Sequence, residues 1–338
     1  MSKRIILGFL FSLWFSPLVI AHAQDPGVVA GAKKEGEVSF YTGKSLGIMQ
    51  IISQAFEKKY PFLKVKITRT SGEGIINRIR AEKLAGKILF DVVSTIPVGL
   101  LEPLNVIKPY CSPEAKVFPA QFKHPNCLWV TLTGNYYVIL YNTKMVAEKE
   151  APKDWNDLLD PKWQQGKIAL DPEEYSWLAG MEQYLGEEKT RNLMTALARQ
   201  GIRWQKGHSN LVDLTAAGEF HLALSYATRT EVIKEKGAPV QWIKSTKPII
   251  SDLNSVALSA QPTHPNAAML WIDFLLSHEA QKIFFDNKEP VFRPGVMPPN
   301  SSLNPANLEV TPVPARIFTP TVFKHYQAKF DEIFGPRR

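Results

Sequence analysis

The stretch from residue 38 to residue 95 alternates between strand and helix patterns, and this order constrains the fold more than any other feature of the chain. Apolar residues that recur every three or four positions predict helices that end before Pro61 and Gly86. Short runs of β-branched and aromatic residues predict strands at 38–41, 64–68 and 89–93. This order is typical of a parallel sheet covered by helices, so we predict an α/β fold.

Each predicted strand ends in a loop that is rich in glycine and hydroxyl groups. Ligands of parallel sheets bind beyond the carboxyl ends of the strands. Two of these loops open onto helix N-termini, whose free N–H groups favour negative charge, and Ser71 is a suitable N-cap. The candidate ligand-binding residues of these loops are Tyr41, Thr42, Gly43, Lys44, Ser71, Gly72, Ser94 and Thr95.

The middle third of the chain repeats the pattern, with a predicted helix at 209–217. Strands are predicted at 136–141, 167–170 and 220–226. Two similar halves, each with a loop-rich rim, predict two lobes that face one another. The candidate ligand-binding residues of the second half are Asp171, Tyr175, Ser176, Tyr226 and Arg229.

The last third contains the longest helical pattern of the chain. A strand is expected at 255–258, and a single broad amphipathic helix is expected at 265–285, with a proline at its start. The Pro- and Asn-rich stretch 287–320 predicts a segment that wraps the surface before a last helix at 321–333.

Some candidates have a second, purely structural interpretation. Asp171 fits either a contact to an amino group or the cap of the next helix. Lys44 and Arg229 fit charge-assisted bonds to an acidic ligand, or ordinary surface charge. Tyr136 and Tyr137 lie in one strand, so their side chains are expected on opposite faces.

The first 23 residues have the layout of a secretory signal peptide. Lys3 and Arg4 precede an apolar run at 5–20, and Ala21-His22-Ala23 offers a cleavage site. A short buried helix or a membrane anchor is the alternative. We expect a mature chain that begins near Gln24 and works outside the cytoplasm.

Composition excludes little beyond disorder. The 40 basic and 32 acidic residues give a formal net charge of +8, but the bases are scattered, so no nucleic-acid interface is predicted. No nucleophile elbow, zinc-protease pair or phosphate loop is present, so neither an enzyme nor a cofactor is expected.

The chain has two cysteines, Cys111 and Cys127. In an oxidising compartment an even count favours a disulfide, which here would close a Pro-rich loop. Two free buried thiols are the alternative.

Several segments resemble a known family. They are Phe40-Tyr41-Thr42-Gly43, the segments 138–144 and 155–168, Ala216-Ala217-Gly218-Glu219-Phe220, and 264–277. Their order resembles that in the extracellular solute-binding proteins of bacterial ABC importers, especially the branch related to ferric-ion binding proteins. The resemblance covers nearly all of the mature chain.

The resemblance implies a type II periplasmic binding protein with two α/β lobes that close over a small-molecule ligand. It implies a periplasmic monomer that works with an ABC permease of the inner membrane. The chain would cross between the lobes near Tyr141-Asn142 and Asn254-Ser255. The implied division is a signal peptide at 1–23, a first lobe of 24–140 and 255–295, and a second lobe of 141–254 and 296–338.

The ligand needs a separate argument. Ferric-binding relatives use a histidine, a glutamate and a tyrosine pair. The matching positions here are Lys44-Ser45, Ser94-Thr95 and Tyr226-Ala227, which hold one tyrosine and no carboxylate. Because Fe³⁺ needs several anionic oxygens, we predict a small anionic or zwitterionic organic solute instead. Ferric iron, a sensor-linked module and a secreted enzyme are the alternatives.

Two further groups of residues are expected to have structural roles. Ser209 or Asn210 is expected to cap the helix that follows His208. Asp252 and Asn254 lie beside the second predicted crossing, where we expect them to order the hinge.

Overall fold

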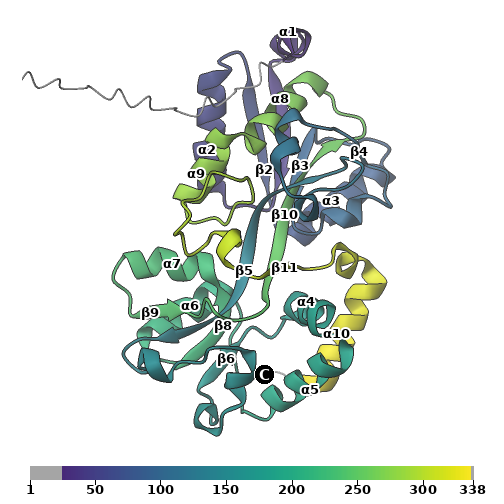
Figure 1. Ribbon diagram of the computed structural model, residues 1–338. Coiled ribbons are helices and arrows are strands. Elements are labelled where there is room, and N and C mark those ends of the chain that lie inside the picture. The colour runs from purple at the N-terminus through teal and green to yellow at the C-terminus, as the bar shows by residue number, and fades with distance from the viewer. Residues whose placement is uncertain (1–24, 336–338) are drawn as a thin grey trace, which may run out of the picture.

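The computed structural model describes residues 25–335, so the predicted signal peptide lies outside the described residues. Figure 1 shows two lobes joined by the long strands β5 (Val130–Asn142) and β10 (Ile249–Ser259). No helix between residues 25 and 335 combines the length and the apolar character that crossing a membrane requires.

The first lobe follows the predicted alternation of strand and helix. Ser71 caps α3 by accepting a bond from the Gly74 N–H, as expected. The helices are α1 (Pro26–Glu35), α2 (Leu46–Lys59), α3 (Gly72–Leu84), α8 (Pro265–Leu276) and α9 (His278–Asp286), with 3₁₀ turns η1 (Val98–Leu101), η2 (Pro113–Val117) and η3 (Ala120–Phe122). The strands are β1 (Glu37–Thr42), β2 (Lys64–Arg69), β3 (Val92–Thr95) and β4 (Ile107–Lys108).

The second lobe repeats this arrangement. Its helices are α4 (Tyr175–Leu185), α5 (Glu187–Ala198), α6 (His208–Ala217), α7 (Ala227–Glu235) and α10 (Pro320–Phe334), with η4 (Glu148–Glu150), η5 (Trp155–Leu159) and η6 (Pro161–Trp163). Its strands are β6 (Ile168–Leu170), β7 (Arg203–Trp204), β8 (Leu222–Tyr226) and β9 (Val240–Trp242). The segment before α10 holds η7 (Pro305–Asn307), β11 (Val310–Pro312) and η8 (Ala315–Phe318).

One sheet runs through both lobes, in the order β2-β1-β3-β10-β5-β8-β6-β7. The strands β2, β1 and β3 are parallel to one another, and so are β8, β6 and β7. The two shared strands are antiparallel to each other and to their outer neighbours β3 and β8. The fold is therefore the predicted two-lobe α/β type, with two antiparallel strands as the connection.

The two faces of this sheet are covered differently. One apolar core, which we call the common core, lines one face in both lobes and includes residues of α2, α6, α7 and α8. On the other face, α3 and η1 cover the first lobe and α4, α5 and α10 cover the second, in two separate cores. The apolar cover is thus continuous on one face and interrupted on the other.

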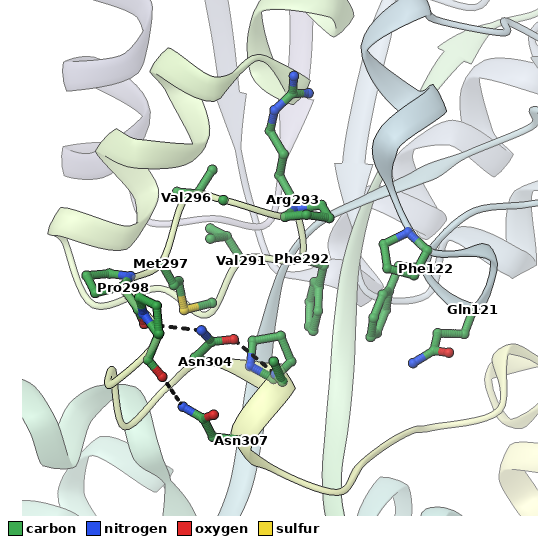
Figure 2. A pocket seen from close by; sticks show the side chains of 16 residues that line it. Gln121, Phe122, Val291, Phe292, Arg293, Val296, Met297, Pro298, Asn304 and Asn307 are labelled. Carbon is green, nitrogen blue, oxygen red and sulfur yellow. Dashed lines mark hydrogen bonds between the residues drawn. The ribbon is translucent and has the colours of Figure 1, made fainter. Parts of the chain in front are cut away.

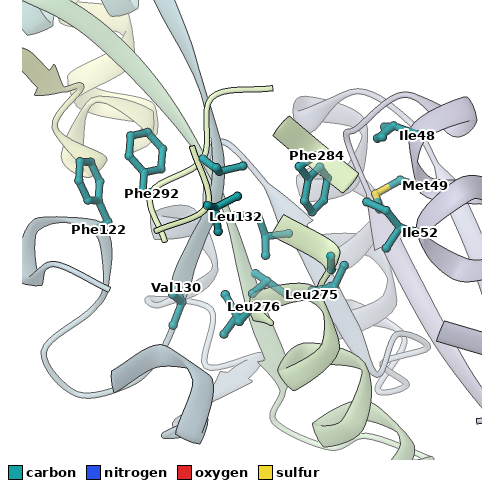
Figure 3. Packing of buried hydrophobic residues seen from close by; sticks show 14 of the residues in the cluster. Ile48, Met49, Ile52, Phe122, Val130, Leu132, Leu275, Leu276, Phe284 and Phe292 are labelled. Atoms are coloured by element: carbon teal, nitrogen blue, oxygen red, sulfur yellow. The ribbon is translucent and has the colours of Figure 1, made fainter. Parts of the chain in front are cut away.

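Figure 3 shows part of the common core. Leu132 of β5 lies near Leu275 and Leu276 of α8, and all three side chains are fully buried. Phe122 and Phe292 stack with their ring centroids 4.0 Å apart. This packing ties the segment after α9 to the loop between β4 and β5.

Four elements differ from the sequence predictions. The strand β3 (Val92–Thr95) was expected at 89–93, so Ser94 and Thr95 lie in the strand and not in the loop that follows it. The shared strand β5 begins at Val130, well before the expected start at 136, and β10 begins at Ile249. The expected helix at 265–285 is two helices, because Ser277 takes an extended conformation and its hydroxyl caps α9 by accepting from the Ala280 N–H. The division of the chain into lobes stays a proposal, with parts of β5 and β10 serving both.

Cys111 and Cys127 form a disulfide across 16 residues. The bridge closes the irregular loop that holds η2 and η3, whose backbone makes few ladder contacts. A crosslink of this kind stabilises the folded protein mainly because it restricts the conformations of the unfolded chain.

We predict that replacing both cysteines with serine lowers the free energy of unfolding by roughly 3 kcal/mol. Chemical denaturation measures this difference. Wild-type protein under reducing conditions is the matched control and should lose a similar amount. An unchanged unfolding midpoint in the double variant would contradict the role of the bridge.

A second prediction concerns the contact between α4 and β10. A Cβ atom at Gly180 would lie 2.4 Å from Ile250 Cγ2, so only glycine permits this approach. We expect Gly180→Ala to destabilise the protein by about 1–3 kcal/mol through overpacking. The added cost should shrink in an Ile250→Ala background, where the clashing atoms are absent.

Gly47→Ala on α2 is the control for this substitution, because nothing lies within 4 Å of its added Cβ. It should be neutral or stabilising, since alanine favours helix. Equal losses at Gly47 and Gly180 in denaturant titrations would rule out the proposed close contact.

Candidate functional site

A polar strip separates the two cores on the face of the sheet whose apolar cover is interrupted. On β5, Thr131, Thr133 and Asn135 occupy alternate positions, and the positions between them face the common core. Thr131 Oγ1 lies 3.3 Å from Ser255 Oγ on β10, so both hydroxyls lie on the same face. We call these residues, together with Asp252 of β10, the hinge strip.

The three predicted rim loops of the first lobe converge beside this strip. The Gly43 N–H donates to the Ser94 carbonyl at 3.0 Å. A Cβ atom at Gly43 would lie 3.8 Å from the Gly72 nitrogen, and one at Gly72 would lie 3.2 Å from Thr95 Oγ1. Three loops that are distant in sequence therefore form one surface at the carboxyl ends of β1, β2 and β3.

Thr95 connects this surface to the hinge strip. Its partner across the sheet is Ser255. The side chain is fully buried, yet its Oγ1 makes no hydrogen bond within residues 25–335. Close by, Gly72 is the first residue of α3, and the first N–H groups of a helix have no partner inside the helix. A buried, unpartnered hydroxyl thus lies beside the first turn of α3, where the Gly74 N–H is already capped by Ser71.

Seven side chains of the second lobe and the hinge form what we call the polar cluster. They come from the end of β6, the N-termini of α4 and α6, the end of β8, and the two shared strands. Its members are Asp171, Glu174, Ser176, His208, Tyr226, Tyr137 and Asp252.

A chain of hydroxyl groups ends on Asp252. Tyr226 donates to the Tyr137 hydroxyl at 3.3 Å, and Tyr137 donates to Asp252 Oδ2 at 2.7 Å. Ser176 lies close enough to Asp252 to lower the pKa of its carboxyl. Tyr137 and Tyr226 are partners across the β5–β8 ladder, which places both rings on one face. The register of the sheet therefore builds this half of the cluster.

Helix starts build the other half. Glu174 precedes α4 and lies 3.1 Å, through Oε1, from Nε2 of His208 at the start of α6. The His208 ring stacks on Tyr226 with centroids 3.9 Å apart and planes 12° apart. Asp171 accepts bonds from the N–H groups of Glu173 and Gly207, at 2.9 and 2.6 Å. Asp171 therefore orders the start of both helices.

The cluster raises the pKa of each of its strongly perturbed groups. Burial raises the pKa of Glu174 and of Asp252, although His208 and the Tyr137 hydroxyl oppose this effect. Burial and the neighbouring Asp252 raise the pKa of Tyr137 and Tyr226 well above the usual value. Burial lowers the pKa of His208, but the Glu174 carboxylate outweighs it and the pKa is raised. Burial therefore favours the neutral form of the acids, whereas the Glu174 carboxylate favours the charged form of His208.

The two cations expected to bind an acidic ligand are already paired. Lys44 is buried, with its Nζ 2.5 Å from Glu289 and 3.0 Å from Thr133 Oγ1. Arg229 lies in α7 and forms a two-pronged contact with Asp213, at 2.6 and 2.7 Å. Both charges are thus compensated by carboxylates of the protein, and a ligand contact of Lys44 or Arg229 stays a prediction.

Other candidates also have different surroundings from those expected. The Tyr41 hydroxyl donates to Glu82 at 2.7 Å within the first-lobe core. Thr42 is buried, and its hydroxyl accepts from the Lys44 N–H at 3.1 Å. The Tyr175 ring packs against Phe323 and Phe330 of α10 rather than lying in the polar cluster.

Sequence reasoning missed several members of the cluster. Glu174 was not a candidate, and His208 was expected only to precede a helix. Tyr137 was assigned to packing, although its side chain does lie on the face opposite Tyr136, as predicted. The alternation of Thr131, Thr133 and Asn135 with apolar residues was the available signal for a polar face at this point of β5.

A separate cavity of about 820 Å³ lies beside the common core, lined by the segment from Val291 to Asn307 and by Phe122 (Figure 2). Its amides are used locally, since Asn304 donates to the Pro298 carbonyl at 3.1 Å and Asn307 to the Pro299 carbonyl. None of the candidate residues lines it. The hinge strip and polar cluster, not this cavity, combine unused polar groups with the carboxyl ends of strands.

Solved structures share this fold at low sequence identity. Iron-bound HitA from Pseudomonas aeruginosa superposes with a TM-score of 0.73 at 21% identity, covering 88% of this chain and 99% of its own. AfuA from Actinobacillus pleuropneumoniae, with fructose-6-phosphate bound, gives 0.72 at 21% identity over 89% and 99%. An uncharacterised protein of Haemophilus influenzae is 23% identical over 272 residues, 76% of this chain and 77% of its own length.

The sequence also matches one protein family over most of its length. The match to the bacterial extracellular solute-binding proteins spans residues 52–304. Members of this family bind solutes and are not enzymes. This chain therefore belongs to the bacterial extracellular solute-binding proteins, the solute-binding components of ABC transporters.

Proposed function

We propose that this protein captures a small organic solute with an acidic group between its two lobes, in the periplasm, and delivers it to an ABC permease of the inner membrane. The observation that carries the ligand class is the unused Thr95 hydroxyl beside the N-terminus of α3. A buried hydroxyl without a partner is costly, and a ligand oxygen would satisfy it.

The first-lobe rim suits an acidic group without a paired cation. Free N–H groups in the first turn of a helix bind carboxylate and phosphonate oxygens. Gly72 begins α3 and lies beside Thr95. Backbone and side-chain donors therefore converge on one point. Glycine at position 72 permits the close packing of these loops, since a Cβ there would lie 3.0 Å from Pro97 Cδ.

Ferric iron is the second candidate, and one observation favours it. The hydroxyls of Tyr137 and Tyr226 lie 3.3 Å apart, beside Asp252, and oxygen donors of this kind suit Fe³⁺. HitA, which shares the fold, was solved with iron bound. Against this candidate, no group of three His, Cys, Asp or Glu residues within 25–335 converges as a metal site.

A titration decides between these candidates. We expect heat on mixing with members of a panel of straight-chain carboxylates, phosphonates and their ω-amino derivatives. We expect no visible tyrosinate-to-iron band on addition of ferric citrate. A visible band, together with no heat on mixing with any acid of the panel, would instead assign iron as the cargo.

Thr95→Val tests the rim directly. The variant keeps the shape of the side chain but removes its hydroxyl, so affinity for the acids that bind should fall by roughly tenfold. The free energy of unfolding should not fall, because the hydroxyl has no protein partner.

Thr190→Val is the matched control, because Thr190 is also fully buried with an unpartnered Oγ1 but lies on α5, away from the rim. Its affinity for the same acids should equal that of the wild type. Equal affinities in all three proteins would contradict a ligand contact at Thr95.

A further inference from the structure

We propose that the polar cluster binds a protonated amino group of the same solute, so that the cargo is a zwitterion with its ammonium end in the second lobe. This inference rests on the proposed function, which places the acidic end at the first-lobe rim. It adds a site for the opposite charge and thereby narrows the class of solute.

The first support is the balance of charge. The cluster contains three carboxyl groups, those of Asp171, Glu174 and Asp252. Among the described residues, His208 is the only cationic side chain that hydrogen-bonds or ion-pairs with any of them. No Lys or Arg of the described chain does so. One imidazole therefore contacts the three carboxyl groups directly, and Lys206, which pairs with Glu173, acts on Asp171 from a longer distance. At the rim, Glu289 already neutralises Lys44.

The second support is that two carboxyl oxygens are unused. Glu174 Oε2 and Asp252 Oδ1 are buried and have no hydrogen-bond partner in residues 25–335. Glu174 is fully buried and Asp252 is 4% exposed. A buried acceptor without a donor is destabilising, and an ammonium group supplies three donors. A carboxylate of the ligand, which only accepts, would leave these oxygens unpaired.

The surrounding rings also suit a cation. Tyr137 and Tyr226 meet edge to face with centroids 5.0 Å apart, and both belong to the cluster. An ammonium group near aromatic faces gains attraction from their electron density. The raised pKa of His208 agrees with this view, because the Glu174 carboxylate stabilises a positive charge on the imidazole despite its burial.

The hinge strip fixes the separation of the two ends. Asp252 belongs to the cluster, and Ser255 on the same strand is the partner of Thr95 at the rim. A register shift between Asn254 and Ser255 brings both side chains to one face, and three residues of strand span at most about 10 Å. A short ω-amino acid, whose charged groups are a few bonds apart, fits this span once its hydrogen bonds are included.

The test compares three probes that share a carbon chain: γ-aminobutyrate, butyrate and butylamine. Calorimetric titration of the wild type should give the highest affinity for γ-aminobutyrate. The variants Glu174→Gln and Asp252→Asn keep the size and the existing hydrogen bonds of each side chain. Each should lower affinity for γ-aminobutyrate by roughly tenfold or more and leave that for butyrate unchanged.

Thermal unfolding of the ligand-free variants separates binding from structure. Asp252→Asn should unfold at the same temperature as the wild type, because the affected oxygen has no protein partner. Glu174→Gln also removes the ion pair with His208, so a small decrease is expected for this variant. Glu182→Gln is the control on α4, where Glu182 pairs with Lys329. It should leave both affinities unchanged.

The outcomes distinguish the two proposals. If the wild type binds butyrate as tightly as γ-aminobutyrate, and neither variant matters, the ammonium site is wrong and the proposed function stands. If only butylamine binds, the acidic end is wrong and the cluster still binds a cation. If the variants unfold early and lose all affinities equally, the cluster is structural and this inference is overturned.

Discussion

Hydrogen bonding between β5 and β10 determines the arrangement of everything else in this protein. The two strands pair with each other and then each pairs with a strand of a different lobe, β10 with β3 and β5 with β8. Because side chains alternate along a strand, the register assigns each residue of the hinge to one face. A single apolar core extends through both lobes on one face. On the other face, the hinge strip lies between two separate cores.

Charge is divided between the lobes in a way that residue type alone does not reveal. The first-lobe rim has donors, in the amides of α3 and the hydroxyl of Thr95, and its lysine is already neutralised. The second lobe has acceptors, in Glu174 and Asp252, with a single imidazole beside them. Complementary ends of this kind select a solute by its charge pattern as well as by its size.

The sequence predicted those features that depend on local chemistry. Strand ends, rim loops and the Ser71 cap follow from short patterns, and so does the opposite orientation of Tyr136 and Tyr137. Features that depend on distant partners were not predictable in this way. Nothing near Lys44 points to Glu289, which lies 245 residues away. Glu174 follows β6 and His208 follows β7, and the two meet because these strands are neighbours, which the order of elements alone does not establish.

The common core has a consequence for how such a protein changes its cargo during evolution. It joins the lobes along one face of the sheet and contains none of the polar groups that we propose as contacts of the solute. Substitutions on the opposite face of the sheet can change the residues that contact the solute without disturbing the packing of the common core. Selectivity can therefore drift quickly while the architecture, and the folding free energy that it supplies, stays the same.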